Sequence, residues 1–242
     1  MGSRLGEPFG KNCDGLAVPQ GPKEARYQLA TDKGPRVMML VKQAKMAPET
    51  HLLASWVIAA LATDNPRDCR LVTLAGILPD ADGLGLLVDA ATGAWGHHAT
   101  HYYVQYHHYL LHGAFGGAVI AALVTCFARR RWRVALLALV VFHLHILCDL
   151  AGSRGPSPED LWPIFYFGPF TKDPMWIWKG QWRLDAWPNR FLSAALFIWA
   201  LFLAVPRGYS FVGVFNRRVD EIFVGVLRKW HAAWKRRLGR DG

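Results

Sequence analysis

The chain contains few cysteines, and their spacing matches no metal or redox motif. The four are Cys13, Cys69, Cys126 and Cys148, a pattern that excludes zinc-finger and C-x-x-C proteins. Cys126 and Cys148 lie inside apolar runs, where we expect ordinary buried thiols. Strand signals are also scarce and no internal repeat is evident, so the sequence predicts an all-α fold.

We also expect neither a signal peptide nor a soluble basic face. Residues 1–36 are polar and rich in Gly and Pro, which predicts a flexible N-terminal tail. The formal charge of +10 could by itself indicate nucleic-acid binding, but much of the Lys and Arg flanks apolar runs, in segments 129–133 and 228–240. We therefore expect no nucleic-acid partner and interpret both segments as cytoplasmic anchors on anionic lipid.

Hydrophobic residues are abundant and clustered, which predicts an integral membrane protein. They make up 52% of the chain. A full span needs roughly 20 residues, and only 110–128 and 134–150 approach that length. We expect a compact antiparallel membrane helix bundle within residues 37–206, with helices over 37–46, 51–62, 71–78, 110–128, 134–150 and 191–205. A long loop rich in Trp and Pro is expected over 151–190.

The C-terminal part, residues 207–242, is basic and amphipathic. Over 217–238 its apolar residues lie on one helical face opposite the basic residues: Ile222, Phe223, Val226, Leu227 and Trp230. This pattern is typical of a helix that lies on a membrane surface.

Ionisable residues occur at the ends of the apolar segments, where they are energetically costly and often functional. His51 begins the first helix, Asp80 and Asp82 follow the second, His107, His108 and His112 precede the third, and His145 and Asp149 end the fourth. Because consecutive helices of an antiparallel bundle run in opposite directions, short connections place all of these residues at one end. The sequence therefore predicts one polar site.

His145 and Asp149 are the strongest pair within this set. They are four residues apart, so both side chains lie on one helical face, and burial of either without a partner would be costly. His51 alone is as compatible with a helix cap, and Asp80 with Asp82 is as compatible with a turn. His143 lies about 200° from His145 around the helix, and we expect it, like His97, His98, His101 and His231, to be a bystander.

Imidazole and carboxylate groups are the ligands that zinc or manganese prefers in a catalytic site. We expect Zn, with Mn as an alternative, bound as one or two ions by His51, Asp80, His112, His145 and Asp149, with either His107 or His108 as a further ligand. Two-metal sites are typical of phosphoester hydrolysis. Asp82 is the expected general base.

These motifs resemble a family of small membrane-bound metal-dependent hydrolases that includes the LexA-regulated inner-membrane protein. Its pattern is T-H-x-L/A-x-G/S, L-P-D-x-D, H-R-G-x-T-H-S, S-H-x-x-x-D, L-W-P-F and D-P-x-x-N. The matches here lie in order over about residues 48–200 and are Thr50–Leu53, Leu78–Asp82, His107–Gly113, His145–Asp149, Leu161–Ile164 and Asp185–Asn189. The resemblance implies a metal-dependent hydrolase, with Asp185 and His108 near the ligands.

The third motif departs from the family pattern. His108, Leu111 and Gly113 replace the family's Arg, Thr and Ser, so any role of those side chains in binding substrate is in doubt. The family pattern makes His107 and His112 the ligand pair, five residues apart. The geometry of an α-helix would instead favour His108 with His112, which are four residues apart. A loop over 107–109 would favour His107.

The sequence thus predicts an integral membrane hydrolase that acts on an ester or phosphoester of a small-molecule or lipid-like substrate at the membrane surface. Membrane lipid is the expected partner, and no oligomeric state is indicated. The alternatives are a non-enzymatic metal-binding or transport protein, whose ligands would be spaced along a path through the bilayer, and a membrane scaffold, which leaves the buried His145 and Asp149 unexplained.

Overall fold

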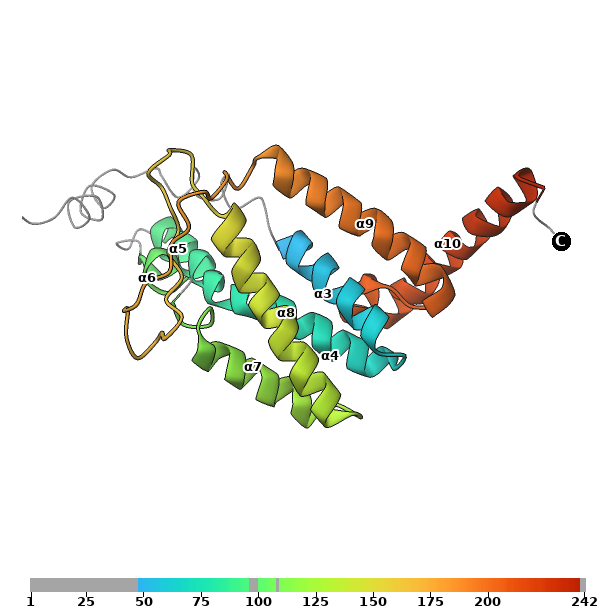
Figure 1. Ribbon diagram of the computed structural model, residues 1–242, viewed down its shortest axis with the longest axis horizontal. Coiled ribbons are helices and arrows are strands. Elements are labelled where there is room, and N and C mark those ends of the chain that lie inside the picture. The colour runs from blue at the N-terminus through green and yellow to red at the C-terminus, as the bar shows by residue number, and fades with distance from the viewer. Residues whose placement is uncertain (1–47, 96–99, 108, 240–242) are drawn as a thin grey trace, which may run out of the picture. The chain divides into compact units, whose positions relative to one another are not determined.

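Helices are the regular secondary structure of the part that a computed structural model describes, residues 48–95, 100–107 and 109–239, and an irregular segment joins the helix that ends at Gly152 to the one that begins at Trp187. All of these residues belong to the structural unit Val41–Gly242. The elements shown in Figure 1 are α3 (Pro48–Ala62), α4 (Pro66–Ile77), the 3-10 helix η1 (Leu78–Leu84), α5 (Gly85–Ala94), α6 (Tyr102–Tyr106), α7 (Ala114–Cys126), α8 (Arg131–Gly152), α9 (Trp187–Arg207), the 3-10 helix η2 (Phe211–Val214) and α10 (Arg217–Arg237). The all-α prediction is confirmed, whereas the expected tail 1–36 and helix 37–46 lie outside the described residues.

Helix ends follow from local capping chemistry. The Asn65 side chain accepts hydrogen bonds from the backbone N–H groups of Arg67 and Asp68, with Pro66 in the first turn. This cap begins α4 five residues before the predicted start, because a proline is tolerated where its missing N–H has no helical partner. Gly208, at φ 75°, ends α9 in the left-handed conformation that favours glycine.

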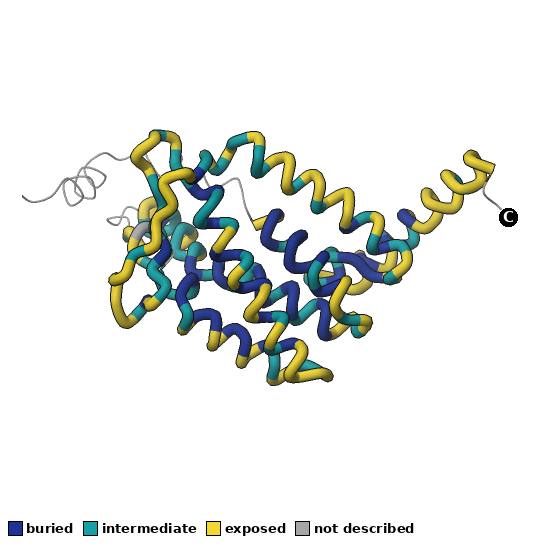
Figure 2. Tube along the Cα trace, in the orientation of Figure 1, coloured by how far each residue is buried: buried dark blue, intermediate teal, exposed yellow. Residues whose placement is uncertain are grey.

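The core forms where α3, α4, α7 and α8 meet. In Figure 1, α3 lies between α8 and α9, and it packs on α4, α8 and α9, while α8 also packs on α4 and α7. Trp56, Val72, Val141 and Phe142 are among the fully buried side chains. Figure 2 shows buried residues concentrated on the facing sides of these helices, whereas most of α9 is exposed.

Three helical segments are long and apolar enough to cross a membrane by length and composition: Pro66–Ala94, Arg131–Gly152 and Trp187–Arg207. The expected near-span 110–128 is wrong in length, since α7 covers only Ala114–Cys126. Gly113 precedes it with an extended backbone, so residues 110–113 form a turn rather than helix. The sequence pattern also underestimated the length of α9, which is a full-length candidate span.

Several sequence expectations need correction. Cys126 is exposed and Cys148 half-buried, because in a membrane bundle an apolar residue can face lipid instead of the core. The loop predicted for 151–190 ends earlier, since α9 begins at Trp187 with Pro188 in its first turn. Pro206 does not stop α9 but lies in its last turn. The short helices α5 and α6 were not anticipated.

The C-terminal amphipathic helix is confirmed as α10. Asn216 caps it by accepting hydrogen bonds from Arg218 N and Val219 N. It packs on α9 and η2 through one face that includes the buried Val224 and Leu227. Its C-terminal half extends beyond the end of α9 (Figure 1) and is largely exposed.

Candidate metal centre

The ligand candidates come from five different elements and meet at one end of the bundle. His51 lies in the first turn of α3, Asp80 and Asp82 in η1, and His145 and Asp149 in the last turns of α8. His107 follows α6, and His112 lies in the turn before α7. Seven side chains form three groups that could hold a metal ion, namely His51–His145–Asp149, Asp80–His112–His145 and Asp82–His107–His112.

The centre of the cluster consists of two imidazole nitrogens and two carboxylate oxygens. His112 Nε2 lies 3.2 Å from His145 Nε2. Asp149 Oδ2 is 3.1 Å from His145 Nε2 and 3.4 Å from His112 Nε2. Asp80 Oδ1 is 3.6 Å from His145 Nε2 and 3.9 Å from His112 Nε2. The two shared histidines therefore link the three groups into one site.

The outer ring nitrogens determine which tautomer each histidine adopts. His145 Nδ1 donates to the carbonyl oxygen of Gly76 at 2.8 Å, and His112 Nδ1 donates to Asp82 Oδ2 at 3.0 Å. Each ring therefore turns its Nε2 lone pair toward the centre of the cluster. Two lone pairs 3.2 Å apart, next to two carboxylates, require a cation between or beside them, either a proton or a metal ion.

Asp82 lies behind the two histidines of the third motif. Its Oδ1 accepts a hydrogen bond from His107 Nδ1 at 2.8 Å, and its Oδ2 accepts from His112 Nδ1 and from the backbone N–H of Leu111. His107 lies in a turn after α6 and not in a helix. This is the condition under which the sequence favoured His107 over His108. Both His107 and His112 can reach one carboxylate because no helix imposes a four-residue spacing here.

His51 completes the other side of the cluster. Its Nε2 donates to Asp149 Oδ1 at 3.1 Å, and its ring stacks on that of His145 with centroids 3.8 Å apart. The buried atoms His51 Nδ1 and Asp80 Oδ2 have no hydrogen-bond partner within the described ranges. Among the ligand candidates, Asp80 has the most exposed side chain, at 26%.

The electrostatic environment favours positive charge. Burial lowers the pKa of His112, but its hydrogen bonds to Asp149 and Asp82 and the negative charge of both carboxylates outweigh burial and raise the pKa to about 9. Three carboxylates, of Asp80, Asp82 and Asp149, share this small volume. The site is therefore suited to bind cations.

Asp185 and the described bystander histidines lie outside the cluster. Asp185 is exposed and forms an ion pair with Arg183 at 2.7 Å, outside the three groups. His108 lies outside the described residues, as do His97 and His98. His143 is exposed and engages both ring nitrogens, Nδ1 with the Leu139 carbonyl and Nε2 with the Tyr166 hydroxyl. His101 and His231 are also exposed.

Sequence reasoning did not assign a supporting role to the residues that hold the ligands in place. The Gly76 carbonyl, which orients His145, belongs to the backbone and carries no sequence signal. Trp162 packs against the rings of His107 and Tyr103, and the buried Gln181 side chain holds its backbone through two hydrogen bonds. Asn189, the last residue of the last family motif, fastens this segment to α8 by donating to the Gly152 carbonyl.

The comparisons with known proteins agree with this architecture. No curated protein and no solved structure matches the chain. One family model, described as YdjM inner membrane protein, matches residues 46–215, a range that contains every candidate ligand and all three candidate membrane spans. Because this match covers well over half of the sequence, the chain belongs to the YdjM family of inner membrane proteins.

Proposed function

We propose that this protein is a membrane-bound metal-dependent hydrolase that acts on an ester or phosphoester of a lipid-like substrate. The observation that carries the proposal is the convergence of His112 Nε2 and His145 Nε2 on the oxygens of Asp80 and Asp149. Nitrogen and oxygen donors in this mixture are typical of zinc, with manganese as the alternative. The two unpartnered buried atoms, His51 Nδ1 and Asp80 Oδ2, fit the same interpretation.

Because the three groups share histidines, they form one cluster that could hold one or two ions. A bound divalent ion supplies a Lewis acid and lowers the pKa of water so that hydroxide is available near neutral pH. The protein's own residues provide the rest. Asp80 presents a carboxylate that is partly open to the outside of the cluster. Trp162 covers the His107 side and limits the access of water there.

Asp82 is assigned a positioning role in this proposal. Both of its oxygens already accept hydrogen bonds from His107, His112 and Leu111. Direct transfer of a proton from water to Asp82, the role predicted from the sequence, would require one of these bonds to break. Carboxylates that orient ligand histidines typically hold the ring and raise its basicity.

Transport is the rival function for the same ligands. A transport path needs sites spaced through the bilayer, whereas the three groups here share residues and lie at one end of the bundle. This placement favours hydrolysis over transport.

The test compares three positions in α8. His145→Ala and Asp149→Ala should each remove most bound metal and most hydrolysis of a water-soluble phosphoester, because each loses a ligand. His143→Ala is the matched control, since His143 belongs to the same helix but hydrogen-bonds outside the cluster. It should keep both properties, at a cost of at most roughly 1–3 kcal/mol in stability.

The measurements are metal analysis and turnover of the purified, folded variants. His145→Gln and Asp149→Asn provide variants of similar size where the alanine forms fail to fold. Full metal occupancy in both the His145 and the Asp149 variants would refute the metal centre and with it the hydrolase proposal.

A further inference from the structure

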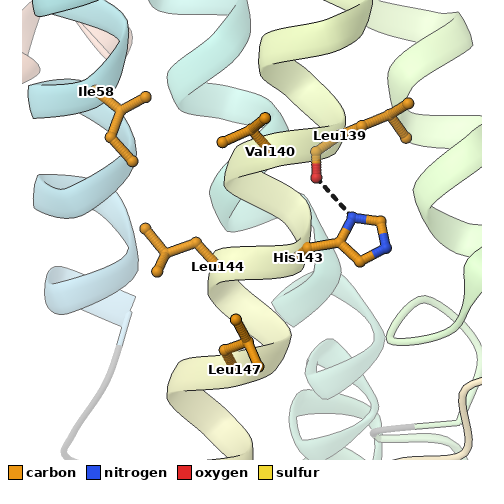
Figure 3. Close-up of a pocket in the computed structure, with 6 residues that line it drawn as sticks. All are labelled: Ile58, Leu139, Val140, His143, Leu144 and Leu147. Carbon is orange, nitrogen blue, oxygen red and sulfur yellow. Dashed lines mark hydrogen bonds between the residues drawn. The ribbon is translucent and has the colours of Figure 1, made fainter.

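A groove follows the outer surface of α8 where it packs beside α3. Its cavity of about 470 Å³ is lined by Ile58, Leu139, Val140, His143, Leu144 and Leu147, which Figure 3 draws along successive turns of α8 with Ile58 opposite on α3. The only ionisable side chain, His143, has both ring nitrogens engaged. The groove is therefore an apolar channel.

This groove lies on the side of the protein that faces hydrocarbon. The segment Arg131–Gly152 is a candidate membrane span, and Leu139, Val140 and Leu147 are exposed on it. The medium that reaches these side chains in a membrane is lipid rather than water. A hydrocarbon chain is consequently the occupant that matches both the lining and the surroundings of the groove.

A second cavity, of about 170 Å³, lies next to the groove and reaches the candidate metal centre. Its lining includes Leu147, which also lines the groove, and the ligand candidates His51 and Asp149. Leu192 of α9 forms part of the opposite wall, and Ser153 contributes a hydroxyl that donates to Asp149. Leu147 thus lies between an apolar groove and a cavity that is lined by residues of the polar cluster.

We propose that the substrate is a bilayer lipid that reaches the site sideways from the membrane, with its polar headgroup in the smaller cavity and one acyl chain in the groove along α8. The proposal rests on the proposed function for the identity of the headgroup as a phosphoester. The tail site itself depends only on the groove and on Leu147, which lines both the groove and the cavity beside the cluster. A water-soluble substrate would use the polar cavity but not the groove.

The test fills the groove without touching the ligands. Leu144→Trp and Val140→Trp place a large side chain in the channel, and Leu136→Trp is the control, because Leu136 is exposed on the same helix and does not line the groove. In nanodiscs, the two groove variants should lower kcat/KM for dioleoyl phosphatidic acid by about tenfold or more. They should leave bound metal and kcat/KM for a short-chain, water-soluble phosphate ester unchanged, and the control should change neither. Equal losses on both substrates, or no loss on either, would overturn the tail site.

A binding measurement separates this inference from the proposed function. Phosphatidic acid with a diazirine in its acyl chain is incorporated into phosphatidylcholine nanodiscs, irradiated, and the labelled residues are identified by mass spectrometry. Labelling within 139–147 should fall when excess unlabelled phosphatidic acid is added, whereas labelling at Leu136 should follow only the bulk lipid. Wild-type protein that hydrolyses neither substrate but shows this competition would refute the hydrolase and retain the lipid site. Labelling of 139–147 that is not competed would refute the lipid site, whatever the activity.

Discussion

Asp82 illustrates how one buried carboxylate can organise a site without touching its centre. It receives hydrogen bonds from two histidines and one backbone N–H. Removing its charge leaves the shape of the side chain but weakens both histidine contacts. We expect Asp82→Asn to lower metal affinity by about 10–100-fold while metal still binds at saturating concentration.

Competition with a chromogenic chelator, run on purified wild-type and variant protein, measures this change. Asp185→Asn is a suitable control because Asp185 is exposed and its carboxylate pairs with Arg183, outside the cluster. An affinity unchanged by Asp82→Asn would contradict the positioning role. Complete loss of metal would instead indicate that Asp82 is itself a ligand.

Gly76 is the second residue on which the geometry depends. A Cβ atom at this position would lie 2.6 Å from the Ser55 Cβ and closer still to its hydroxyl, so α3 and α4 could not keep their separation. The Gly76 carbonyl also accepts the hydrogen bond that orients His145. We expect Gly76→Ala to destabilise the protein by about 1–3 kcal/mol, as overpacking does, and to weaken metal binding.

Thermal unfolding in detergent, with and without added metal, checks this expectation. Gly225→Ala is the control, since a Cβ there meets nothing within 4 Å. A Gly76→Ala protein with wild-type melting temperature and metal content would show that the helices separate without cost.

At the scale of the element, α10 carries two apolar faces that serve different neighbours. Val224 and Leu227 are buried. A separate row, Val219, Ile222, Val226, Trp230 and Trp234, is exposed at helical spacing. Basic residues fill much of the remaining surface. An exposed apolar row beside Lys and Arg is typical of a helix on an anionic membrane surface.

We therefore expect the exposed row of α10 to lie in the headgroup region of a bilayer. A spin label at position 234 should collide more often with oxygen than with a water-soluble nickel complex in nanodiscs that contain phosphatidylglycerol. A label at the adjacent Lys235, which lies about 100° further around the helix, should show the opposite preference. Equal accessibility of both labels to the nickel complex would contradict membrane contact.

For the whole molecule, charge is distributed unequally between the two ends of the bundle. The α7–α8 connection contains Arg129 and Arg130, and Arg131 begins α8. The buried Asp68 holds the connection by accepting hydrogen bonds from the backbone N–H groups of Arg129 and Arg130. Arg207 and the basic α10 lie at the end of α9. The candidate metal centre lies at the opposite ends of α7 and α8. Because Lys and Arg are enriched in cytoplasmic loops, we expect the centre to face the exoplasmic side.

Cysteine labelling tests this orientation. In a background without the four native cysteines, a membrane-impermeant maleimide added to intact cells should modify Lys172→Cys but not Arg130→Cys. Lys172 lies near the Tyr109 ring at the end that carries the metal centre. Modification of position 130 alone would reverse the assignment.

Topology and helical spacing were sufficient to predict where the polar residues would meet. The alternation of helix directions placed His51, Asp80, His112 and Asp149 at one end, and the structure brings these four within contact of shared partners. The face of α8 that carries His145 and not His143 followed from 3.6 residues per turn. These predictions depend only on regular geometry.

The supporting contacts could not be predicted in the same way. The Gly76 carbonyl meets His145 across 69 positions of sequence, and the Gln181 side chain holds Trp162 within an irregular segment. The hydropathy pattern also predicted the wrong lengths for α7 and α9, since an apolar residue has the same hydropathy whether it faces lipid or protein. Such features depend on tertiary packing rather than on local pattern.

The distribution of ligands along the chain has a consequence for biosynthesis. Two of the three groups require His145, and one of these also requires Asp149, so they are incomplete in a nascent chain that has been translated only through α7. Metal loading at the shared centre would therefore follow insertion of α8 into the membrane. With the centre on the exoplasmic side, the ion would come from that compartment rather than from the cytoplasm where the ribosome works. The cell would then supply the finished protein with metal only after its helices have assembled.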